Sequence, residues 1–499
     1  MYKKNQIIEL DIIDFGNNLE GIAKKDNFVF FVKGAIIGEK VLTKITKVGS
    51  KFAYARMLQI VTKSPARTKA ECQYFGKCGG CHCMHMNIDL QKQTKRNIII
   101  NAINKYTPVD HTSIQNITNE TINIPTIPYR NKIQLPIGYD KQGKLIIGFF
   151  RENSNEIIDI DECIISINSQ NAITAIKEYI TQSKDTAYFG YCYTNNHHPN
   201  NHYFTTGKNQ LEQSNQTISS NNSKSSQQSK GNLRHIVVRT INHKSIITVV
   251  CRQGSLKNEE QLCIILDKYF DNPVVFINTN NKDNNTILGD EYRRIDKNDN
   301  PTFQSLNIQY QLHPAAFLQV NQPIAELLYN RILQTLQKNN IKKVIDAYSG
   351  IGILSAIIAK QGILVQAIEI VQQAHDTAQQ IKSQNDLTTL QNIVGDANQI
   401  LPQLLQSTAQ TKKQTNDIDN SLNHTSVILD PPRKGCDTQL LQVLNQSQPL
   451  LIIYVSCNSS TLARDLNQLI SNYHLESLTP YDMFFETKHI ETLAVLRRK

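Results

Sequence analysis

The sequence predicts a multidomain α/β protein whose last part, 311–499, is a class I doubly wound sheet. One predicted strand, 342–346, is followed by a glycine turn and an apolar helix over 353–359. Two further apolar runs, 426–430 and 451–457, have the pattern of buried strands and end in a carboxylate and a thiol. Because the chemistry of open α/β sheets lies at the carboxyl ends of the strands, we expect the functional site there.

The 499 residues predict two to four domains. Short strands separated by glycines predict an OB-like β-barrel over 1–65, a fold that binds nucleic acid on a basic, aromatic-bearing face. A central α+β domain is expected over 66–310, with strands such as 145–150 and 245–250. The net charge of +10 suits a polyanionic partner, although many proteins reach that value. The barrel residues that could meet phosphate are Lys24, Lys25, Lys33, Lys44, Lys47, Lys51 and Arg56.

Cys457 and Asp430 follow two strands that we expect to lie in the same sheet. A thiol and a carboxylate at two such strand ends suggest a nucleophile beside a positioning group. A lone cysteine is more often a buried structural residue, so Cys457 by itself does not establish this chemistry. The motifs around it favour the nucleophile.

The turn Gly350-Ile-Gly352 indicates a cofactor site, since glycines let the backbone approach a ligand closely. Dinucleotide enzymes use similar turns, so this signal alone is weak. Here no third glycine opens the helix, and the next strand ends at Glu369, whose carboxylate can accept hydrogen bonds from a ribose diol. Together with Asp430-Pro-Pro, this combination favours an S-adenosylmethionine (SAM) site over a nicotinamide site.

The chain resembles the RNA 5-methyluridine methyltransferases, and most closely the iron–sulfur-containing type that modifies 23S ribosomal RNA. The resemblance covers nearly the whole chain and rests on the segments 316–321, 346–352, 430–435, 455–458 and 489–492. It implies that the N-terminal barrel is a TRAM domain. It also implies that SAM is contacted by Gln319, Tyr348, Glu369 and Asp430.

The resemblance further implies that Cys457 is the nucleophile and Glu491 the general base. Carbon 5 of uracil is a poor nucleophile, so a thiolate first adds to carbon 6 and makes carbon 5 carbanion-like. After methyl transfer, a base must remove the carbon 5 proton before the thiolate can leave. A carboxylate that opens a terminal strand is usually only solvated; the match of His489-Ile-Glu491 to the family pattern is what favours a role for Glu491.

Three neighbouring positions bear on the substrate and on the rigidity of the loops. Arg433 follows Asp430-Pro-Pro, where RNA 5-methylcytosine enzymes carry a cysteine and amino-group methyltransferases an aromatic residue, so uracil carbon 5 is favoured. Ser459 and Phe485 stand where the family commonly has proline. Each loses a rigid turn residue, which affects loop rigidity more than chemistry.

Four cysteines crowd one glycine-rich segment, 72–83, and indicate a metal or redox site in a reducing compartment. Zinc and an iron–sulfur cluster are both four-thiolate sites, and spacing alone leaves both open. The resemblance implies a [4Fe–4S] cluster with a structural or RNA-orienting role, held by Cys72, Cys78, Cys81 and Cys163. Cys83 is left without an assigned role.

The remaining expectations concern localisation and insertions. No secretory h-region opens the chain, and no apolar run approaches the roughly 20 residues of a membrane span. We therefore expect a cytoplasmic protein without a membrane partner. We also expect a monomer. The segment 195–230, rich in Asn, Ser and Gln, is expected to be a disordered insertion. A second polar insertion, 406–423, is expected to separate a helix from a strand in the methyltransferase domain.

Three functions follow as hypotheses. The first is SAM-dependent methylation of uridine carbon 5 in 23S ribosomal RNA. The second is the same chemistry on the T-loop of tRNA; simpler tRNA enzymes of the family lack the barrel and the cysteines, although some cluster-bearing relatives act on tRNA. The third is a non-catalytic iron–sulfur RNA-binding protein, which the presence of Cys457 and Glu491 opposes.

Overall fold

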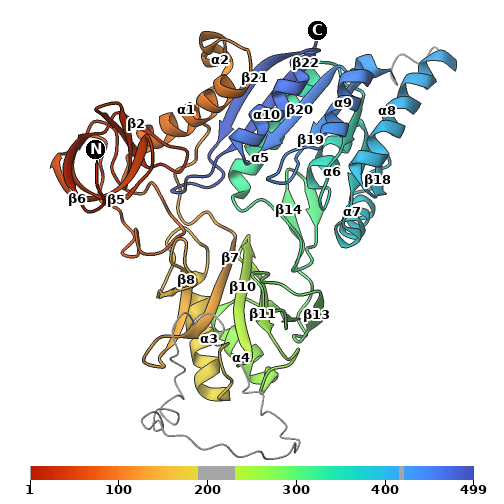
Figure 1. Ribbon diagram of the computed structural model, residues 1–499. Coiled ribbons are helices and arrows are strands. Elements are labelled where there is room, and N and C mark those ends of the chain that lie inside the picture. Colours follow the sequence, from red (N-terminus) through yellow and green to blue (C-terminus); the bar gives the residue numbers. More distant parts are fainter. Residues whose placement is uncertain (1, 189–230, 415–420) are drawn as a thin grey trace, which may run out of the picture. The chain divides into compact units, whose positions relative to one another are not determined.

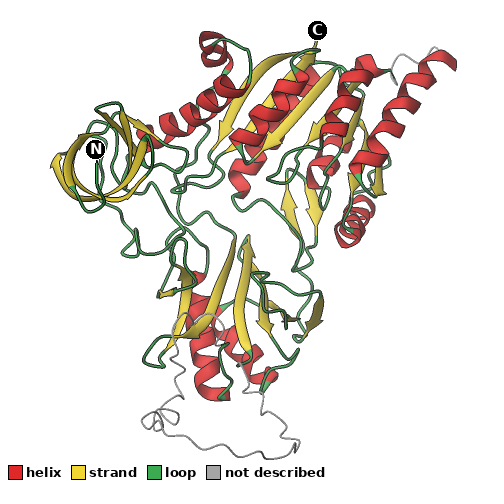
Figure 2. Ribbon diagram, viewed as in Figure 1, coloured by secondary structure: helices red, strands yellow, loops and turns green. Residues whose placement is uncertain are grey.

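The structure is a computed structural model that describes residues 2–188, 231–414 and 421–499 (Figure 1, Figure 2). The expected insertion at 195–230 lies outside the described residues. The chain divides into two compact units. The first contains Met1–Phe75, Cys81–Tyr129 and Thr302–Lys499, and the second contains Gly76–Gly80 and Arg130–Pro301. The segment 81–129, which the sequence grouped with the central domain, therefore belongs with the C-terminal residues.

The N-terminal residues form a six-stranded sheet that curves into a barrel (Figure 1). Its strands are β1 (Ile7–Asp11), β2 (Asp14–Phe15), β3 (Gly21–Lys25), β4 (Phe28–Lys33), β5 (Lys40–Val48) and β6 (Phe52–Thr62). They lie in the order β1-β5-β6-β4-β3-β2. Alternate residues such as Phe30, Val41 and Ile45 are fully buried, because side chains of a strand point to opposite faces.

The C-terminal sheet has seven strands in the order β18-β17-β16-β19-β20-β22-β21. Their bounds are β16 (Lys343–Asp346), β17 (Leu364–Glu369), β18 (Leu390–Val394), β19 (Thr425–Leu429), β20 (Leu451–Ser456), β21 (Tyr473–Tyr481) and β22 (Glu491–Arg498). The first five strands in that order run parallel, and β22 is antiparallel to both its neighbours. The strand order reverses between β16 and β19, which is where open α/β sheets bind their ligands. The predicted doubly wound sheet is confirmed.

Six helices connect and cover these strands (Figure 2). They are α5 (Gln322–Lys338), α6 (Ile353–Ala359), α7 (Gln372–Gln384), α8 (Ala397–Gln414), α9 (Thr438–Ser447) and α10 (Ser459–Leu469). A two-stranded ribbon of β14 (Phe303–Ser305) and β15 (Ile308–Tyr310) precedes them. The expected insertion at 406–423 begins inside α8, since Gln and Lys are good helix formers and continue the helix.

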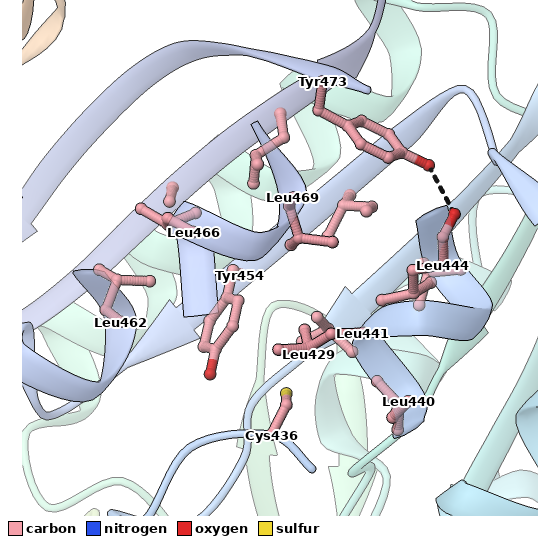
Figure 3. Close-up of a cluster of buried hydrophobic side chains, with 14 of the residues drawn as sticks. Leu429, Cys436, Leu440, Leu441, Leu444, Tyr454, Leu462, Leu466, Leu469 and Tyr473 are labelled. Atoms are coloured by element: carbon pink, nitrogen blue, oxygen red, sulfur yellow. Dashed lines mark hydrogen bonds between the residues drawn. The ribbon is translucent and has the colours of Figure 1, made fainter. Parts of the chain in front are cut away.

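Two N-terminal helices pack on this sheet as well. They are α1 (Ile88–Tyr106), which packs against α10, and α2 (His111–Ile117). Ile99 and Ile103 of α1 share one buried cluster with Leu462 and Leu466 of α10. Figure 3 shows part of this cluster, with side chains from β19, β20, β21, α9 and α10 and Cys436 from the loop before α9. Residues from both sides of the second unit in the sequence therefore build one hydrophobic core.

The second unit contains a seven-stranded sheet in the order β13-β12-β11-β10-β7-β8-β9 and two helices. Its elements are β7 (Lys132–Tyr139), β8 (Leu145–Phe150), β9 (Ile157–Asp159), α3 (Ser169–Ser183), β10 (Leu233–Ile241), β11 (Lys244–Cys251), α4 (Glu259–Tyr269), β12 (Val274–Thr279) and β13 (Glu291–Arg294). In the described part of the chain, no helix is both long and apolar enough to cross a membrane.

Candidate active site

Strand pairing brings Cys457 and Glu491 to the same place at the carboxyl end of β20. The antiparallel ladder of β20 and β22 pairs Ser456 with Thr492. One further step along the same ladder places Cys457, directly after β20, opposite Glu491, the first residue of β22. On its other side, Glu491 pairs with Tyr481 of β21. The two residues expected to act on uracil are thus neighbours through backbone register.

Glu491 lies in a buried position, with only 3% of its surface exposed. Its Oε1 atom is buried and has no hydrogen-bond partner among the described residues. Burial, and after it the charge of Asp430, raises the pKa of Glu491 well above its usual value. This carboxyl therefore favours its protonated form, and once ionised it is a stronger base than an exposed glutamate.

Cys457 is half-buried, and its thiol is surrounded by charged groups of both signs. Burial contributes most to raising the pKa of Cys457, and Glu491 raises it further. Arg433 acts in the opposite direction and lowers this pKa. In the sequence, Arg433 served only to exclude other substrates. In the structure, the positive charge of Arg433 favours the thiolate form of Cys457.

Hydrogen bonds fix the loop that carries Arg433 to the start of α10. Asn458 caps this helix by accepting from the backbone N–H groups of Ser460 and Thr461. The Asn458 Nδ2 and Thr461 Oγ1 atoms each donate to the Arg433 carbonyl at 3.3 Å. The helix cap next to the nucleophile and the loop that carries Arg433 are therefore joined by hydrogen bonds.

Asp465 also binds the loop that carries Arg433. Its Oδ2 atom accepts from the Cys436 backbone N–H at 2.8 Å and from the Tyr454 hydroxyl at 2.7 Å. Figure 3 shows Cys436 and the Tyr454 hydroxyl at the same end of the buried cluster. Gly435 has a left-handed φ of 80°, and an added Cβ would lie 2.5 Å from Asp465 Oδ2. Only glycine permits this close turn.

The glycine turn after β16 lies against Glu369, the last residue of β17. Gly350 has a positive φ of 56°, and its N–H donates to Glu369 Oε2 at 2.9 Å. The Val371 N–H donates to Oε1 of the same carboxylate at 2.7 Å. Ile370 beside it is 65% exposed. A fixed carboxylate with free lone pairs next to an exposed apolar side chain suits a ribose diol and the face of a base.

A row of carboxyl groups runs from Glu369 toward the Cys457 side of the edge. Burial, with Glu369 contributing, raises the pKa of Asp346 to about 6, against the effect of a hydrogen bond from Ser355. Burial and then Asp346 raise the pKa of Asp430 to about 7, and Asp430 in turn acts on Glu491. The sequence interpretation gave Asp346 no role, although its position as the last residue before the glycine turn was the available signal.

The other two expected SAM residues are Tyr348 and Gln319. Tyr348 is half-buried, and burial and then Cys436 raise the pKa of its hydroxyl. Gln319 is buried three residues before α5. Asn321 caps α5 through its Oδ1 atom, while its buried Nδ2 has no hydrogen-bond partner among the described residues. The position of Gln319 is thus known, and its expected contact with SAM stays a prediction.

The outer face of the barrel carries three aromatic rings beside cationic residues. Phe31 stacks on Tyr54 with ring centroids 5.4 Å apart, and Phe52 meets Tyr54 edge-on at 5.9 Å. The parallel pairing of β4 and β6 places Lys33 opposite Arg56 on the same strands. Phe52 and Tyr54 are 38% and 41% exposed. Exposed rings next to cations are the elements that single-stranded nucleic acids stack on and pair with.

Two family models match parts of the chain. The family described as tRNA (Uracil-5-)-methyltransferase matches residues 238–499, and the TRAM domain matches residues 3–58. The chain belongs to the RNA uracil-5-methyltransferase family. It is therefore a SAM-dependent RNA methyltransferase with an N-terminal TRAM domain, as the sequence motifs led us to expect.

Relatives match this family member over its full length. An uncharacterized RNA methyltransferase of Clostridium acetobutylicum is 32% identical, covering 99% of this chain and 98% of the relative. One of Staphylococcus aureus is 30% identical over 99% of each chain. The solved structure of the tRNA (uracil-54, C5)-methyltransferase of Pyrococcus abyssi with S-adenosyl-L-homocysteine has a TM-score of 0.69, 23% identity, and covers 98% of this chain and 99% of its own. That likeness shows a shared fold.

The four expected iron–sulfur ligands are divided between the two units of the chain. Cys72 and Cys81 belong to the first unit, and Cys78 and Cys163 to the second. Within the described ranges, no three His, Cys, Asp or Glu side chains gather as a group that could hold a metal ion. The reaction steps expected of Cys457 and Glu491 need no cluster.

The row of raised carboxyl pKa values predicts that SAM affinity depends on pH. Asp430 is one of the expected SAM residues, and the sulfonium charge of SAM bound beside it would favour its ionised form. Below its pKa of about 7, binding must first release a proton. We expect SAM to bind roughly tenfold more weakly at pH 6 than at pH 8, as one pH unit below that pKa implies.

Calorimetric titration at both pH values measures this effect. S-adenosylhomocysteine is the matched control, because its sulfur is neutral and its affinity should change much less. Asp430→Asn should flatten the dependence for SAM. If the affinities for SAM and S-adenosylhomocysteine depended equally on pH, the expected contact between Asp430 and SAM would be contradicted.

Proposed function

We propose that this enzyme methylates carbon 5 of a uridine in 23S ribosomal RNA through a covalent bond between Cys457 and carbon 6. The observation that carries the chemistry is the position of Cys457 opposite Glu491 across the ladder of β20 and β22. Arg433 favours the thiolate, and the buried Glu491 has a raised pKa that suits a proton acceptor. The choice of 23S ribosomal RNA rests on the sequence resemblance.

The proposed steps balance as follows. The Cys457 thiolate adds to carbon 6, and the electron pair of the carbon 5–carbon 6 double bond moves into the ring as an enolate. Bound SAM supplies an electrophilic methyl group. Carbon 5 takes this methyl group, and S-adenosylhomocysteine is left. The Glu491 carboxylate then removes the carbon 5 proton, and the returning electron pair expels the Cys457 thiolate.

A methyl-transfer assay with labelled SAM tests the proposal directly. Unmodified 23S ribosomal RNA should accept label, and unmodified tRNA serves as the competing substrate. Methylation of tRNA at uridine 54 is the second candidate, favoured by the likeness to the Pyrococcus abyssi tRNA enzyme over 98% of the chain. Because that likeness spans the chain, the barrel does not decide between the two RNAs. Label on neither RNA would support the non-catalytic hypothesis.

RNA containing 5-fluorouridine separates the two catalytic roles. A base can remove the hydrogen on carbon 5 as a proton, but it cannot remove a fluorine in this way. The wild-type enzyme should therefore remain covalently attached to this RNA. Cys457→Ala should abolish the adduct. Glu491→Gln should still form it, and should also accumulate adduct with ordinary uridine while turnover falls by about 10²–10⁴-fold. Denaturing gel electrophoresis measures each adduct, and an adduct in Cys457→Ala would contradict the nucleophile.

The aromatic face of the TRAM domain is part of the proposal as an RNA surface. Replacing both Phe52 and Tyr54 by Ala should weaken RNA binding by tenfold or more, since each stacked base contributes about 1–3 kcal/mol. Val61→Ala is the matched control, because Val61 is exposed on the same strand outside the aromatic cluster. Filter binding at fixed salt measures the effect. Equal affinities for both variants would remove the aromatic face from the RNA path.

A [4Fe–4S] cluster held by Cys72, Cys78, Cys81 and Cys163 is the remaining part of the proposal. Its support is the spacing of the cysteines and one local contact, the Gly80 N–H that donates to Cys78 Sγ at 3.3 Å, as amides do to ligand thiolates. Iron and sulfide analysis of anaerobically purified protein should find four of each per chain, as the cluster's formula requires.

Replacing each of the four cysteines by Ser should lower the iron and sulfide content. The control is Cys83→Ser, because Cys83 is fully buried and desolvation raises the pKa of its thiol to about 12. It should leave the iron content unchanged. Zinc in place of iron would reject the cluster and retain the site.

A further inference from the structure

The loop that leads from β21 into Glu491 is held by residues nearly 400 positions away. Asp482, the first residue after β21, has a fully buried carboxylate whose Oδ1 lies 2.5 Å from Lys95 Nζ on α1. The Lys95 side chain is 1% exposed. Asn123 Nδ2 donates to Asp482 Oδ2 at 2.8 Å, and the Asp482 N–H donates to the Ile122 carbonyl at 2.8 Å. Both carboxylate oxygens and the backbone N–H of Asp482 thus contact the segment 81–129.

A second set of contacts holds the middle of the same loop. Gln91 on α1 is buried, and its Nε2 donates to Glu486 Oε2 at 3.2 Å. The Glu486 carbonyl accepts from the backbone N–H groups of His82 and Cys83 at 2.9 and 3.3 Å. Glu486 itself has a left-handed φ of 66°, an unfavourable conformation for this residue type that these contacts maintain.

Cys83, which the sequence left without a role, completes this set. Its Sγ lies 3.4 Å from both Gln91 Oε1 and the Thr487 carbonyl. The Tyr129 hydroxyl donates to the Phe485 carbonyl at 2.8 Å, so the position that lacks the family's proline is held by a hydrogen bond instead. Lys95 Nζ also donates to the Phe484 carbonyl at 3.5 Å, so four consecutive residues of the loop, 484–487, contact the segment 81–129.

A buried lysine and aspartate are a costly way to join two elements if stability alone is served. Desolvation offsets most of the attraction within such a pair, and apolar residues of the same size often stabilise a protein equally well. What a buried pair does provide is a single geometry, because leaving either charge unpaired is strongly unfavourable. The element whose geometry is fixed here ends at Glu491, whose Oε1 has no hydrogen-bond partner within the described ranges.

We propose that the Lys95–Asp482 pair, assisted by Gln91 and Cys83, is a positioning device for Glu491 and acts on the proton-removal step of methylation. This rests on the proposed role of Glu491. Cys457 lies between β20 and the Asn458 cap of α10, whereas the polar contacts of Lys95, Gln91 and Cys83 described above go to the loop before Glu491. Loosening the loop should therefore slow the release of methylated RNA while leaving formation of the covalent adduct nearly intact.

The test compares two rates in the full-length protein. One is adduct formation with 5-fluorouridine RNA in the presence of SAM, which needs Cys457 but no proton removal. The other is turnover on ordinary RNA. In Lys95→Met we expect turnover to fall about 10- to 100-fold, as for a small misplacement of a catalytic group, and adduct formation to change less than about threefold. Covalent complex with ordinary RNA should accumulate. Lys95→Arg should restore part of the turnover.

Glu39→Gln is the matched control, because it breaks another buried ion pair, that of Glu39 with Arg67, at 2.5 Å in the first unit. Glu39→Gln should not lower turnover without lowering adduct formation to the same extent. Hydrogen exchange of the peptide 482–490 gives a readout independent of activity and should increase in Lys95→Met but not in Glu39→Gln. If Lys95→Met does not fold, Gln91→Met tests the same loop by removing the bond to Glu486.

Two outcomes would overturn the inference. In one, both rates fall together in the folded variants; in the other, turnover and hydrogen exchange match those of Glu39→Gln. Failure of the proposed function gives a different result, because wild-type protein would then neither methylate RNA nor form the adduct with 5-fluorouridine RNA.

Discussion

The antiparallel ladder between β20 and β22 is the constraint on which the candidate site depends. Each strand delivers one reactive side chain at its end, and the ladder sets which residues face each other. β21 pairs with β22 on the other side, so the position of β22 is defined along both edges. A shift of the register by one residue would turn Glu491 to the opposite face of the sheet. The pairing of nucleophile with base is thus set by backbone hydrogen bonds, which are far less adaptable than side chains.

Burial gives the site its chemical character. The same desolvation that raises the pKa of Asp346, Asp430 and Glu491 also raises the pKa of Cys457. For a proton acceptor this shift is useful, whereas for a thiol nucleophile it is unfavourable. Arg433 offsets part of the effect on the thiol, and its loop is tied to α10 by Asn458 and Thr461. One desolvated environment therefore serves two opposed requirements only because a cation lies beside the thiol.

Local patterns in the sequence predicted most of the sheet and the position of its polar ends. The apolar runs before Asp430 and Cys457 are β19 and β20, and Glu491 opens β22 as expected. These features are encoded within a few residues of each side chain. Contacts across the chain are not encoded in this way. The sequence does not name α10 as the packing partner of α1, and Cys83 could not be assigned without Thr487 beside it.

The pairing of Lys95 with Asp482 also has a consequence for synthesis of the chain. The two residues are 387 positions apart, so α1 leaves the ribosome long before the loop and strands that cover it. Until then, Ile99 and Ile103 have none of their C-terminal partners, and the second unit can fold in the meantime. Contacts of such high sequence separation form late and leave apolar surface exposed to aggregation. The apolar face of α1 therefore stays uncovered until the last part of the chain has been synthesised.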